Sequence, residues 1–270
     1  MPSQADAQLL GGAVANRGRV FRVGDTVRRP VAPYGRATHS VLRQLASAGF
    51  TGSPRLLGAD DRTESLSWIE GHAAGNPLPD WALGEDTLES VAVLVRGFHQ
   101  AVSSYEAAVV AEHQWPTPVP PIYQTGTLSH NDLHPGNIIF ADGRAVGLID
   151  FDLAGPGGIV WDLATLIRCW APLVADADLP GELADRPDRR FERAALLLDA
   201  YGLAGPQRLA VIDALVANHD WTYRIVAEEA GSGHPGFAEY WVAVADQTAR
   251  ARSWLVSHRD RLRAAVGAGS

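Results

Sequence analysis

A polar loop that runs into an apolar hairpin constrains this chain of 270 residues more than any other segment. Residues 129–137 read Ser-His-Asn-Asp-Leu-His-Pro-Gly-Asn, and apolar runs follow at residues 138–140 and 145–149. An Asp-Gly pair, Asp142-Gly143, separates the two runs and favours a tight hairpin turn. The pattern therefore predicts two paired strands, with the polar loop before the first strand and Asp150 directly after the second.

Three side chains are expected to converge where this hairpin begins and ends. Asp132 and Asn137 belong to the polar loop, and Asp150 follows the returning strand. Carboxylate and carboxamide oxygens are the hard ligands that Mg²⁺ prefers, and a carboxylate free of metal can accept a proton from a hydroxyl group. Phosphoryl transfer requires this combination of groups.

The H-x-D-x-x-x-x-N loop from His130 to Asn137, the hairpin and the I-D-F-D sequence at residues 149–152 resemble the aminoglycoside phosphotransferase family, relatives of the protein kinases. The resemblance implies that Asp132 is the catalytic base for the substrate hydroxyl. It implies that Asn137 and Asp150 hold Mg²⁺ with the nucleotide phosphates, and that His130 supports the loop. In the segment 156–164, Asp162 would anchor the catalytic loop from the start of a helix.

The same resemblance covers most of the chain and implies an α+β, protein-kinase-like fold with two lobes. Residues 1–70 would form a nucleotide-binding lobe, a small antiparallel sheet with one helix. Residues 71–270 would form a larger, mainly helical lobe that carries the catalytic loop and binds substrate. The implied reaction moves the γ-phosphoryl group of ATP or GTP to a hydroxyl of a small molecule, with aminoglycoside-like antibiotics among the candidate acceptors.

Local patterns support the small lobe independently. Short strand-like runs at residues 17–23 and 26–30 predict a hairpin, and apolar residues spaced by three and four over 37–48 predict a helix that ends at Gly49. Two more strands are expected at 55–59 and 65–69, and a loop rich in Gly, Asn and Pro follows.

The rest of the chain has mostly helical patterns. One stripe, Leu88, Val91, Val95, Phe98 and Val102, predicts a long amphipathic helix in which Phe98 and His99 serve packing only. Helical periodicity returns at Trp161, with breaks near Pro180, residues 202–206 and residues 231–236.

The chain contains no lysine, because all 23 of its basic residues are arginines. A role that the family gives to a lysine must therefore fall to an arginine. Arg28 is our choice for the residue that grips the phosphates, because it lies on the strand where the family carries its basic residue. A guanidinium can bind phosphate oxygens in a bidentate manner and stays protonated.

Other nucleotide contacts are also implied by the resemblance. Gly11 and Gly12 precede the first hairpin, where kinase-like folds place a flexible turn over the phosphates. Trp68, Ile69 and Glu70 resemble the linker whose backbone would bind the purine. Backbone recognition leaves no residue-specific pattern, so both ATP and GTP remain open as donors.

Two alternatives remain open. Kinases supply a glutamate on the first helix that pairs with the basic strand residue, whereas Thr38 and His39 occupy the expected positions here. The chain could therefore be a nucleotide- or small-molecule-binding protein that has lost efficient transfer. His130 and His134 also fit a hydrolase with Zn²⁺ or Fe, but the other histidines are scattered and Asn137 would then have no role.

The amino-acid composition limits the classes of partner that the chain is expected to bind. The formal net charge of −8 argues against nucleic acid or an anionic membrane as partner, so a small hydroxyl-bearing acceptor is expected. The acidic residues Asp220, Glu228, Glu229 and Glu239 would favour an amine-bearing acceptor if they faced the cleft, or they form a solvated helix face. The single Cys169 and the absence of a signal peptide or an apolar span predict a soluble, cytoplasmic protein. No feature indicates an oligomeric state.

Overall fold

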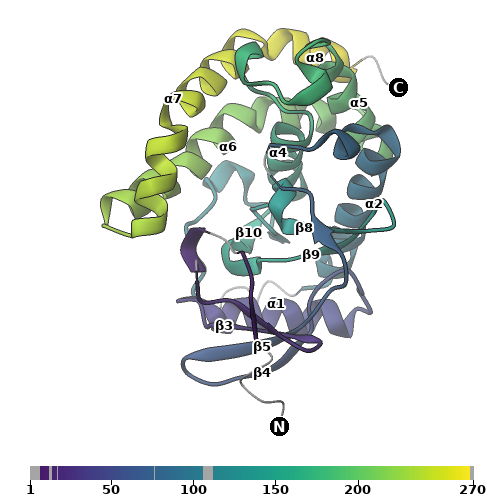
Figure 1. Ribbon diagram of the computed structural model, residues 1–270. Coiled ribbons are helices and arrows are strands. Elements are labelled where there is room, and N and C mark those ends of the chain that lie inside the picture. The colour runs from purple at the N-terminus through teal and green to yellow at the C-terminus, as the bar shows by residue number, and fades with distance from the viewer. Residues whose placement is uncertain (1–6, 12–13, 17, 76, 106–111, 268–270) are drawn as a thin grey trace.

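The computed structural model describes residues 7–11, 14–16, 18–75, 77–105 and 112–267. A twisted antiparallel sheet with one helix lies at one end, and a larger helical region forms the other end (Figure 1). This is the α+β arrangement that the sequence predicts, with a sheet lobe before a mainly helical lobe.

The small lobe is a five-stranded antiparallel sheet with the order β1-β2-β3-β5-β4. Its strands are β1 (Gln8–Leu9), β2 (Phe21–Val23), β3 (Thr26–Pro30), β4 (Leu56–Ala59) and β5 (Thr63–Ser67). The predicted hairpin joins β2 to β3 through Gly24, which has a φ of 59° that suits glycine. The two-residue β1 was not predicted, because so short a strand has no alternating pattern.

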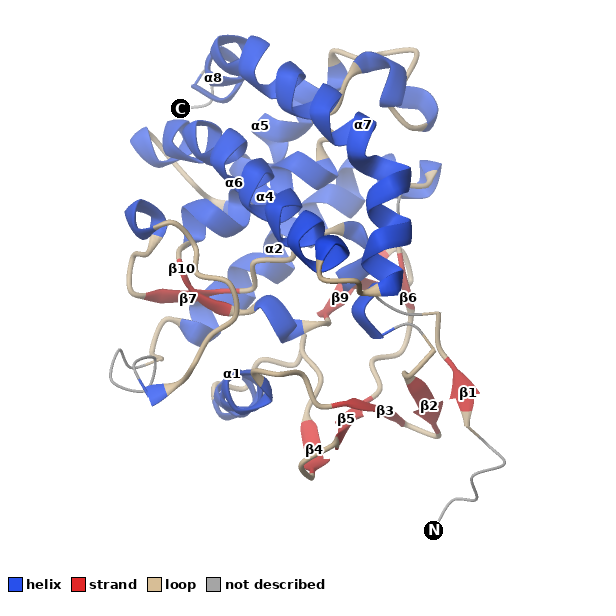
Figure 2. Ribbon diagram, turned by 90° about the vertical axis from the view of Figure 1, so that its left-hand side faces the viewer, coloured by secondary structure: helices blue, strands red, loops and turns tan. Residues whose placement is uncertain are grey.

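Helix α1 (Gly35–Ser47) lies between this sheet and the helical lobe (Figure 2). Its buried stripe includes Val41, Leu42 and Leu45, as the three-and-four spacing predicts. The helix ends where expected, because Gly49 takes a φ of 74° and its N–H donates to the carbonyl of Ala46 at 3.1 Å.

The connection between the lobes is fixed to the catalytic hairpin. Strand β6 (His72–Ala73) pairs with β8 (Ile138–Ala141), which pairs in turn with β9 (Arg144–Leu148). Gly71 crosses β8 so closely that a Cβ atom there would overlap the carbonyl oxygen of Phe140, and its φ is 132°. Only glycine fits this crossing, which brings the linker against the strand that leaves the polar loop.

The large lobe is built on helices, and three of the breaks between them fall where the sequence places them, whereas the break at His258 was not predicted. They are α2 (Glu85–Val102), α4 (Ile159–Trp170), α5 (Arg189–Tyr201), α6 (Pro206–Gly231), α7 (Pro235–Ser257) and α8 (Arg259–Gly267). The five stripe residues predicted in α2 are at most 1% exposed. Two short strands pair with each other, β7 (Thr127–Ser129) and β10 (Gly155–Gly157).

Single-turn 3₁₀ helices connect these elements. They are η2 (Val14–Asn16), η3 (Asp80–Leu83), η4 (Pro121–Tyr123), η5 (Pro135–Asn137), η6 (Phe151–Leu153), η7 (Asp176–Asp178) and η8 (Gly181–Leu183). Among the residues described, no helix has both the length and the apolar character needed to cross a lipid bilayer.

Candidate active site

Asp162, in the first turn of α4, anchors the polar loop that is predicted to be catalytic. Its carboxylate accepts hydrogen bonds from the backbone N–H groups of His130 and Asn131, both at 2.7 Å. The backbone of Asn131 has a φ of 67°, which residues other than glycine rarely adopt. The two hydrogen bonds therefore stabilise a strained part of the loop. Asp162 therefore has the contacts of the loop anchor that the resemblance implies.

A third hydrogen bond to Asp162 comes from His99 on α2, which the sequence analysis assigned to packing alone. The His99 Nε2–H donates to Asp162 at 3.0 Å, and its Nδ1 accepts from the Tyr201 hydroxyl at 2.9 Å. His99 thus orients the buried carboxylate as well as packing against its neighbours. Sequence alone does not indicate this contact, since 63 residues separate the partners.

Asp132 and Asn137 meet across the loop, as predicted. The Asn137 amide donates to the carbonyl of Asp132 and to its Oδ2, both at 2.9 Å. These bonds use the Nδ2 group and fix the orientation of the Asp132 carboxylate, whose side chain is 26% exposed. His134 lies 3.6 Å from the same carboxylate, through its Nε2.

His130 lies beneath the site. Its Nε2–H donates to the carbonyl of Ile149 at 3.0 Å, and its ring packs against Phe98 and Phe151. Burial lowers the pKa of His130, although Asp162 and other carboxylates oppose this, so the ring stays neutral near pH 7. The ring is thus bonded to the backbone beside Asp150, which is the contact that a residue supporting the loop needs.

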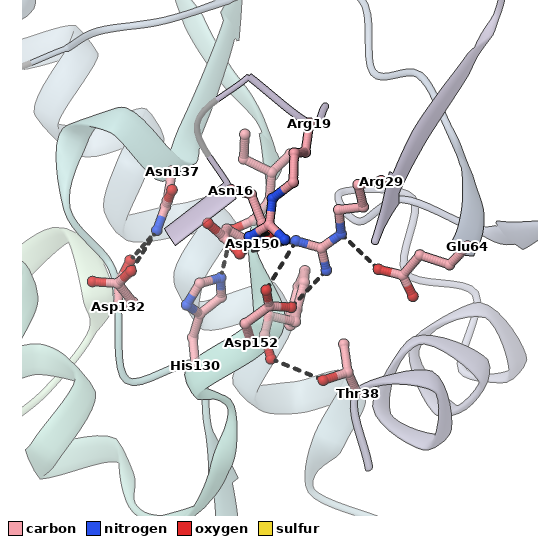
Figure 3. Close-up of polar contacts among 12 residues, drawn as sticks. Asn16, Arg19, Arg29, Thr38, Glu64, His130, Asp132, Asn137, Asp150 and Asp152 are labelled. Atoms are coloured by element: carbon pink, nitrogen blue, oxygen red, sulfur yellow. Dashed lines mark hydrogen bonds and ion pairs between the residues drawn. The ribbon is translucent and has the colours of Figure 1, made fainter. Parts of the chain in front are cut away.

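Asp150 is brought to Asn137 by the return of the hairpin. The N–H of Ile149 donates to the carbonyl of Asn137 at 3.0 Å, which places the next residue, Asp150, beside the loop. Asp150 itself takes a φ of 61° where β9 ends and η6 begins. The predicted convergence of Asp132, Asn137 and Asp150 is therefore present (Figure 3).

An arginine of β3 joins the small lobe to this group, but it is Arg29 and not Arg28. Arg29 Nη1 lies 3.1 Å from Asp150 Oδ1, and Nη2 lies 2.6 Å from Asp152 Oδ1 (Figure 3). Arg28 is exposed on the other face of the strand. The choice of Arg28 was wrong because the side of β3 that meets the other lobe carries Val27 and Arg29, while Arg28 shares the opposite face with Thr26.

Glu64 on β5 supplies the carboxylate that the first helix lacks. Arg29 Nε donates to Glu64 at 2.6 Å, and His39 of α1 contacts the other carboxylate oxygen at 2.5 Å. The missing helix glutamate is thus replaced by a strand glutamate that the helix histidine supports. One signal pointed to it: Glu64 lies two residues before the buried Leu66, so alternation places a charge on the apolar face of the strand.

The carboxyl groups around Arg29 outnumber the basic side chains that contact them, Arg29 itself and His39. Glu64, Asp150 and Asp152 contribute three carboxylates against one guanidinium. Burial and the charge of Asp150 raise the pKa of Asp152, whereas Arg29 acts in the opposite direction. Such a cluster favours a further cation.

The donor set fits Mg²⁺. Asp150 offers a carboxylate, and Asn137 keeps its amide oxygen free of donors from the described residues. Among all the residues that the structure describes, no group of three or more His, Cys, Asp or Glu side chains is arranged so that it could hold a metal ion by itself. Mg²⁺ is commonly held by one or two carboxylates together with substrate phosphates and waters, so a complete protein cage is not required.

The other predicted nucleotide residues lie around the linker and the first strands. Gly11 is exposed after β1, and Gly12 lies outside the described residues. Trp68 donates from its indole to Glu70 at 2.8 Å, and the Trp68 backbone N–H is already bonded to the carbonyl of Asp25. Ile69 packs against Gly147 of β9, which places the linker beside the hairpin that carries the site.

Two of the four acidic residues considered for acceptor binding, Asp220 and Glu228, lie close to arginines. Asp220 is paired with Arg252 at 2.8 Å, and Glu228 lies 3.8 Å from Arg224 on the same exposed helix face. These two pairings favour the solvated-face alternative for Asp220 and Glu228.

Sequence comparisons agree with this geometry. The profile of the phosphotransferase enzyme family (APH) matches residues 98–212, which include the polar loop, Asp150 and Asp162. The trifolitoxin immunity protein of Rhizobium leguminosarum bv. trifolii is 32% identical over 272 residues, covering 96% of this chain and 97% of that protein. A homoserine kinase of Rhizobium meliloti (strain 1021) is 30% identical over 169 residues, 62% of this chain and 45% of that kinase.

Solved structures share the architecture. A choline/ethanolamine kinase family protein of Mesorhizobium loti has a TM-score of 0.62 at 19% identity, over 97% of this chain and 92% of that one. An aminoglycoside phosphotransferase of Alicyclobacillus acidocaldarius has a TM-score of 0.56 at 14% identity, over 97% and 95%. The fold is thus the protein-kinase-like fold of small-molecule phosphotransferases. The chain belongs to the phosphotransferase enzyme family.

Proposed function

We propose that this protein transfers the γ-phosphoryl group of a nucleoside triphosphate to a hydroxyl of a small molecule, with Mg²⁺. The observation that carries the proposal is one continuous set of contacts between the lobes. Asn137 fixes the Asp132 carboxylate, the hairpin brings Asp150 beside Asn137, and Arg29 reaches Asp150 from the other lobe. A protein that only binds a ligand would not need both an oriented base and a metal pair.

Asp132 accepts the proton of the attacking hydroxyl in this proposal. Its carboxylate is partly exposed and held in one orientation by the Asn137 amide, so it is placed to orient a nucleophile. His130 does not touch the substrate; it keeps the loop and the end of β9 in register through the Ile149 carbonyl.

Arg29 takes the phosphate-binding role that the sequence analysis gave to Arg28. Asn137 and Asp150 would hold Mg²⁺, which when bound neutralises charge on the phosphate oxygens. Asp152 gives the guanidinium a second carboxylate at 2.6 Å, so Arg29 stays oriented when Asp150 binds the cation. Glu64 holds the Nε side of the guanidinium throughout.

The acceptor panel should follow the relatives as well as the site. Aminoglycosides belong in it because of the family resemblance, and homoserine, choline and ethanolamine because kinases with those names are relatives or structural neighbours. Trifolitoxin belongs in it because a relative that matches over nearly its full length is named for immunity to that compound.

The test is transfer of label from γ-labelled ATP and GTP with Mg²⁺ to the pooled acceptors. Wild type is compared with Asp132→Asn and with Asp142→Asn, the same chemical change at an exposed turn residue of the hairpin. We expect acceptor-dependent transfer that is lost in the first variant and kept in the second. Nucleotide binding without transfer to any acceptor would instead support the weakened binding protein, and absence of Mg²⁺-dependent nucleotide binding would refute the proposal.

A further inference from the structure

A histidine of the polar loop, His134, lies next to the proposed base but takes no part in the contacts that carry the proposed function. Its Nε2 lies 3.6 Å from Oδ2 of Asp132, and its side chain is 42% exposed. That distance is longer than a hydrogen bond, so the contact in this structure is electrostatic. The same oxygen already accepts a hydrogen bond from Asn137 Nδ2 at 2.9 Å (Figure 3). His134 is thus a second side chain beside Oδ2.

The other ring nitrogen of His134 determines where the imidazole carries its hydrogen. The backbone N–H of Gly136 donates to Nδ1 at 3.0 Å, so Nδ1 is an acceptor and carries no hydrogen. The hydrogen of the neutral ring is therefore on Nε2, the nitrogen that faces Asp132. The group beside the carboxylate is accordingly a donor, which a carboxylate attracts.

The position of the ring is built into the loop. A Cβ atom at Gly136 would lie 2.7 Å from Cε1 of His134 and 3.0 Å from its Nδ1, so the ring occupies the space that a side chain at residue 136 would fill. The carbonyl of His134 accepts from the N–H of Asn137 at 2.9 Å, and Pro135 follows directly. Because these bonds and the proline restrict both backbone and ring, little entropy is lost when His134 makes a further contact.

Capping of the turn η5 does not explain why this residue is a histidine. A cap needs one acceptor near the first N–H groups, and Asp, Asn, Ser and Thr supply it with shorter side chains. The imidazole adds a second nitrogen, and in His134 this nitrogen faces Asp132. The residue therefore serves two partners, the turn that carries Asn137 and the carboxylate of the base.

We propose that His134 is a positioning residue for Asp132: when an acceptor binds, its Nε2–H donates to Oδ2, which leaves Oδ1 to accept the hydroxyl proton. This inference rests on the proposed phosphotransferase function. Contacts between catalytic groups are often long in unliganded sites and shorten in the complex with substrate. Two donors on Oδ2, from Asn137 and His134, restrict rotation of the carboxylate more than one does. Among the described residues, Oδ1 accepts no hydrogen bond and stays available to the acceptor.

The proton then has a defined destination. The hydroxyl oxygen of the acceptor forms a bond to the γ-phosphorus, the bond from that phosphorus to the bridging oxygen breaks, and the nucleoside diphosphate leaves with the electron pair. The hydroxyl proton moves to Oδ1 of Asp132. A donor on Oδ2 lowers the basicity of the carboxylate, but the loose transition state of phosphoryl transfer depends more on positioning than on a strong base. Orientation is therefore what His134 contributes.

His134→Asn removes this contact and keeps the cap. The asparagine supplies an acceptor for the Gly136 N–H but has no nitrogen that reaches Asp132. The rate compared is transfer from γ-labelled ATP with Mg²⁺ to the acceptor that wild type phosphorylates fastest in the pooled assay. We expect an unchanged melting temperature and KM for ATP, and a kcat that is roughly 10-fold lower. The loss stays below the roughly 100-fold that a displacement of about 1 Å can cause, because Asn137 still holds the carboxylate.

His134→Gln makes the opposite change. Its amide N–H reaches about as far as Nε2, but the turn loses its acceptor, so kcat should recover most of the loss while the melting temperature falls. His113→Asn is the matched control, at a histidine whose ring contacts Trp115, and should leave kcat unchanged. A kcat that follows stability in both His134 variants would mean a structural role alone and would overturn the inference.

Gly136→Ala moves the ring without changing it. The added methyl group takes the space that the imidazole occupies, so the ring must turn away from Asp132. We expect about the same loss of kcat as in His134→Asn, and no further loss in the double variant, because both changes remove one contact. Losses that multiply in the double variant would mean that the two residues act separately, contrary to the inference.

An NMR measurement tests the contact without turnover. In protein with isotope-labelled histidine, the shifts of the two ring nitrogens of neutral His134 report which one carries the hydrogen, and His134→Asn assigns the signals. We expect Nε2–H, with an Nε2 shift that changes in Asp132→Asn; an Nδ1–H tautomer would overturn the inference whatever the activity. If wild type phosphorylates none of the acceptors, transfer to a small molecule has failed, and hydrolysis of ATP with water as the acceptor is the rate on which the same variants decide the role of His134.

Discussion

Arg29→Met is the most informative perturbation of the contact between the lobes. The change keeps an unbranched side chain of similar reach but removes the only cation in contact with Glu64, Asp150 and Asp152 among the described residues. The Glu64 side chain is 1% exposed and would become a buried, uncompensated charge, with His39 alone as a partner.

The size of the effect follows from burial. Removing one partner of a buried ion pair costs about 3–5 kcal/mol. Asp150 and Asp152 are 19% and 23% exposed, so water screens their share, and the cost should come mainly from Glu64. We therefore expect Arg29→Met to lower the free energy of unfolding by about 3 kcal/mol, near the lower end of that range.

Urea denaturation followed by tryptophan fluorescence measures this change. The double variant Arg29→Met with Glu64→Gln should recover part of the lost stability, because it removes the stranded charge together with its partner. Mg²⁺ at about ten times its dissociation constant should add about 1.4 kcal/mol to Arg29→Met through Asp150. Wild-type stability of the single variant, or a double variant less stable than the single one, would refute the reasoning.

Three further predictions test other parts of the structure. Asp162→Asn should lower the free energy of unfolding by about 2–4 kcal/mol and reduce kcat, because an amide cannot accept hydrogen bonds from both loop N–H groups and from His99. Denaturation measures the first effect and turnover the second. Unchanged values would contradict the anchor role. Gly71→Ala should cost about 2 kcal/mol or more from its φ of 132° and the overlap with Phe140, and an unaltered melting temperature would argue against that crossing. Burial, with the charge of Arg168, lowers the pKa of His219 from 6.5 to about 4. The stability that neutral His219 contributes is therefore fully present above pH 6.5, and up to about 3 kcal/mol of it is lost as the pH falls from 6.5 through 4. In His219→Gln, the free energy of unfolding should depend less on pH across that window.

Much of the fold was predictable because its elements follow strong local patterns. The stripe on α2, the cap at Gly49 and the hairpin at Asp142 each depend on residues close together in the sequence. The β7–β10 ladder was not predicted, because Gly155, Pro156 and Gly157 are poor strand formers and their pairing depends on a distant partner.

The candidate site was likewise predictable only where it depends on residues close together in the sequence. The convergence of Asp132, Asn137 and Asp150 follows from loop and hairpin spacing, so sequence was sufficient. The choice between Arg28 and Arg29 required knowledge of which face of β3 meets the other lobe, and two adjacent arginines give no such signal. His99 was missed because its partner lies far away along the chain. The alternation of β5 marks Glu64 as a buried charge, but it does not identify Arg29 as its partner.

The absence of lysine explains why the changes around Arg29 belong together. A lysine presents one point charge, whereas the guanidinium of Arg29 offers separate nitrogens that reach Glu64, Asp150 and Asp152 at once. A carboxylate on α1 would compete for the same nitrogens; His39 instead donates to Glu64 and so holds that carboxylate in place for Arg29. The unusual residue on the helix and the unusual residue on the strand therefore compensate for each other. The lack of lysine is therefore compatible with a working phosphotransferase and is not by itself a sign of a binding protein that has lost transfer. Any attempt to place a lysine at position 29 would have to change Glu64 and His39 as well.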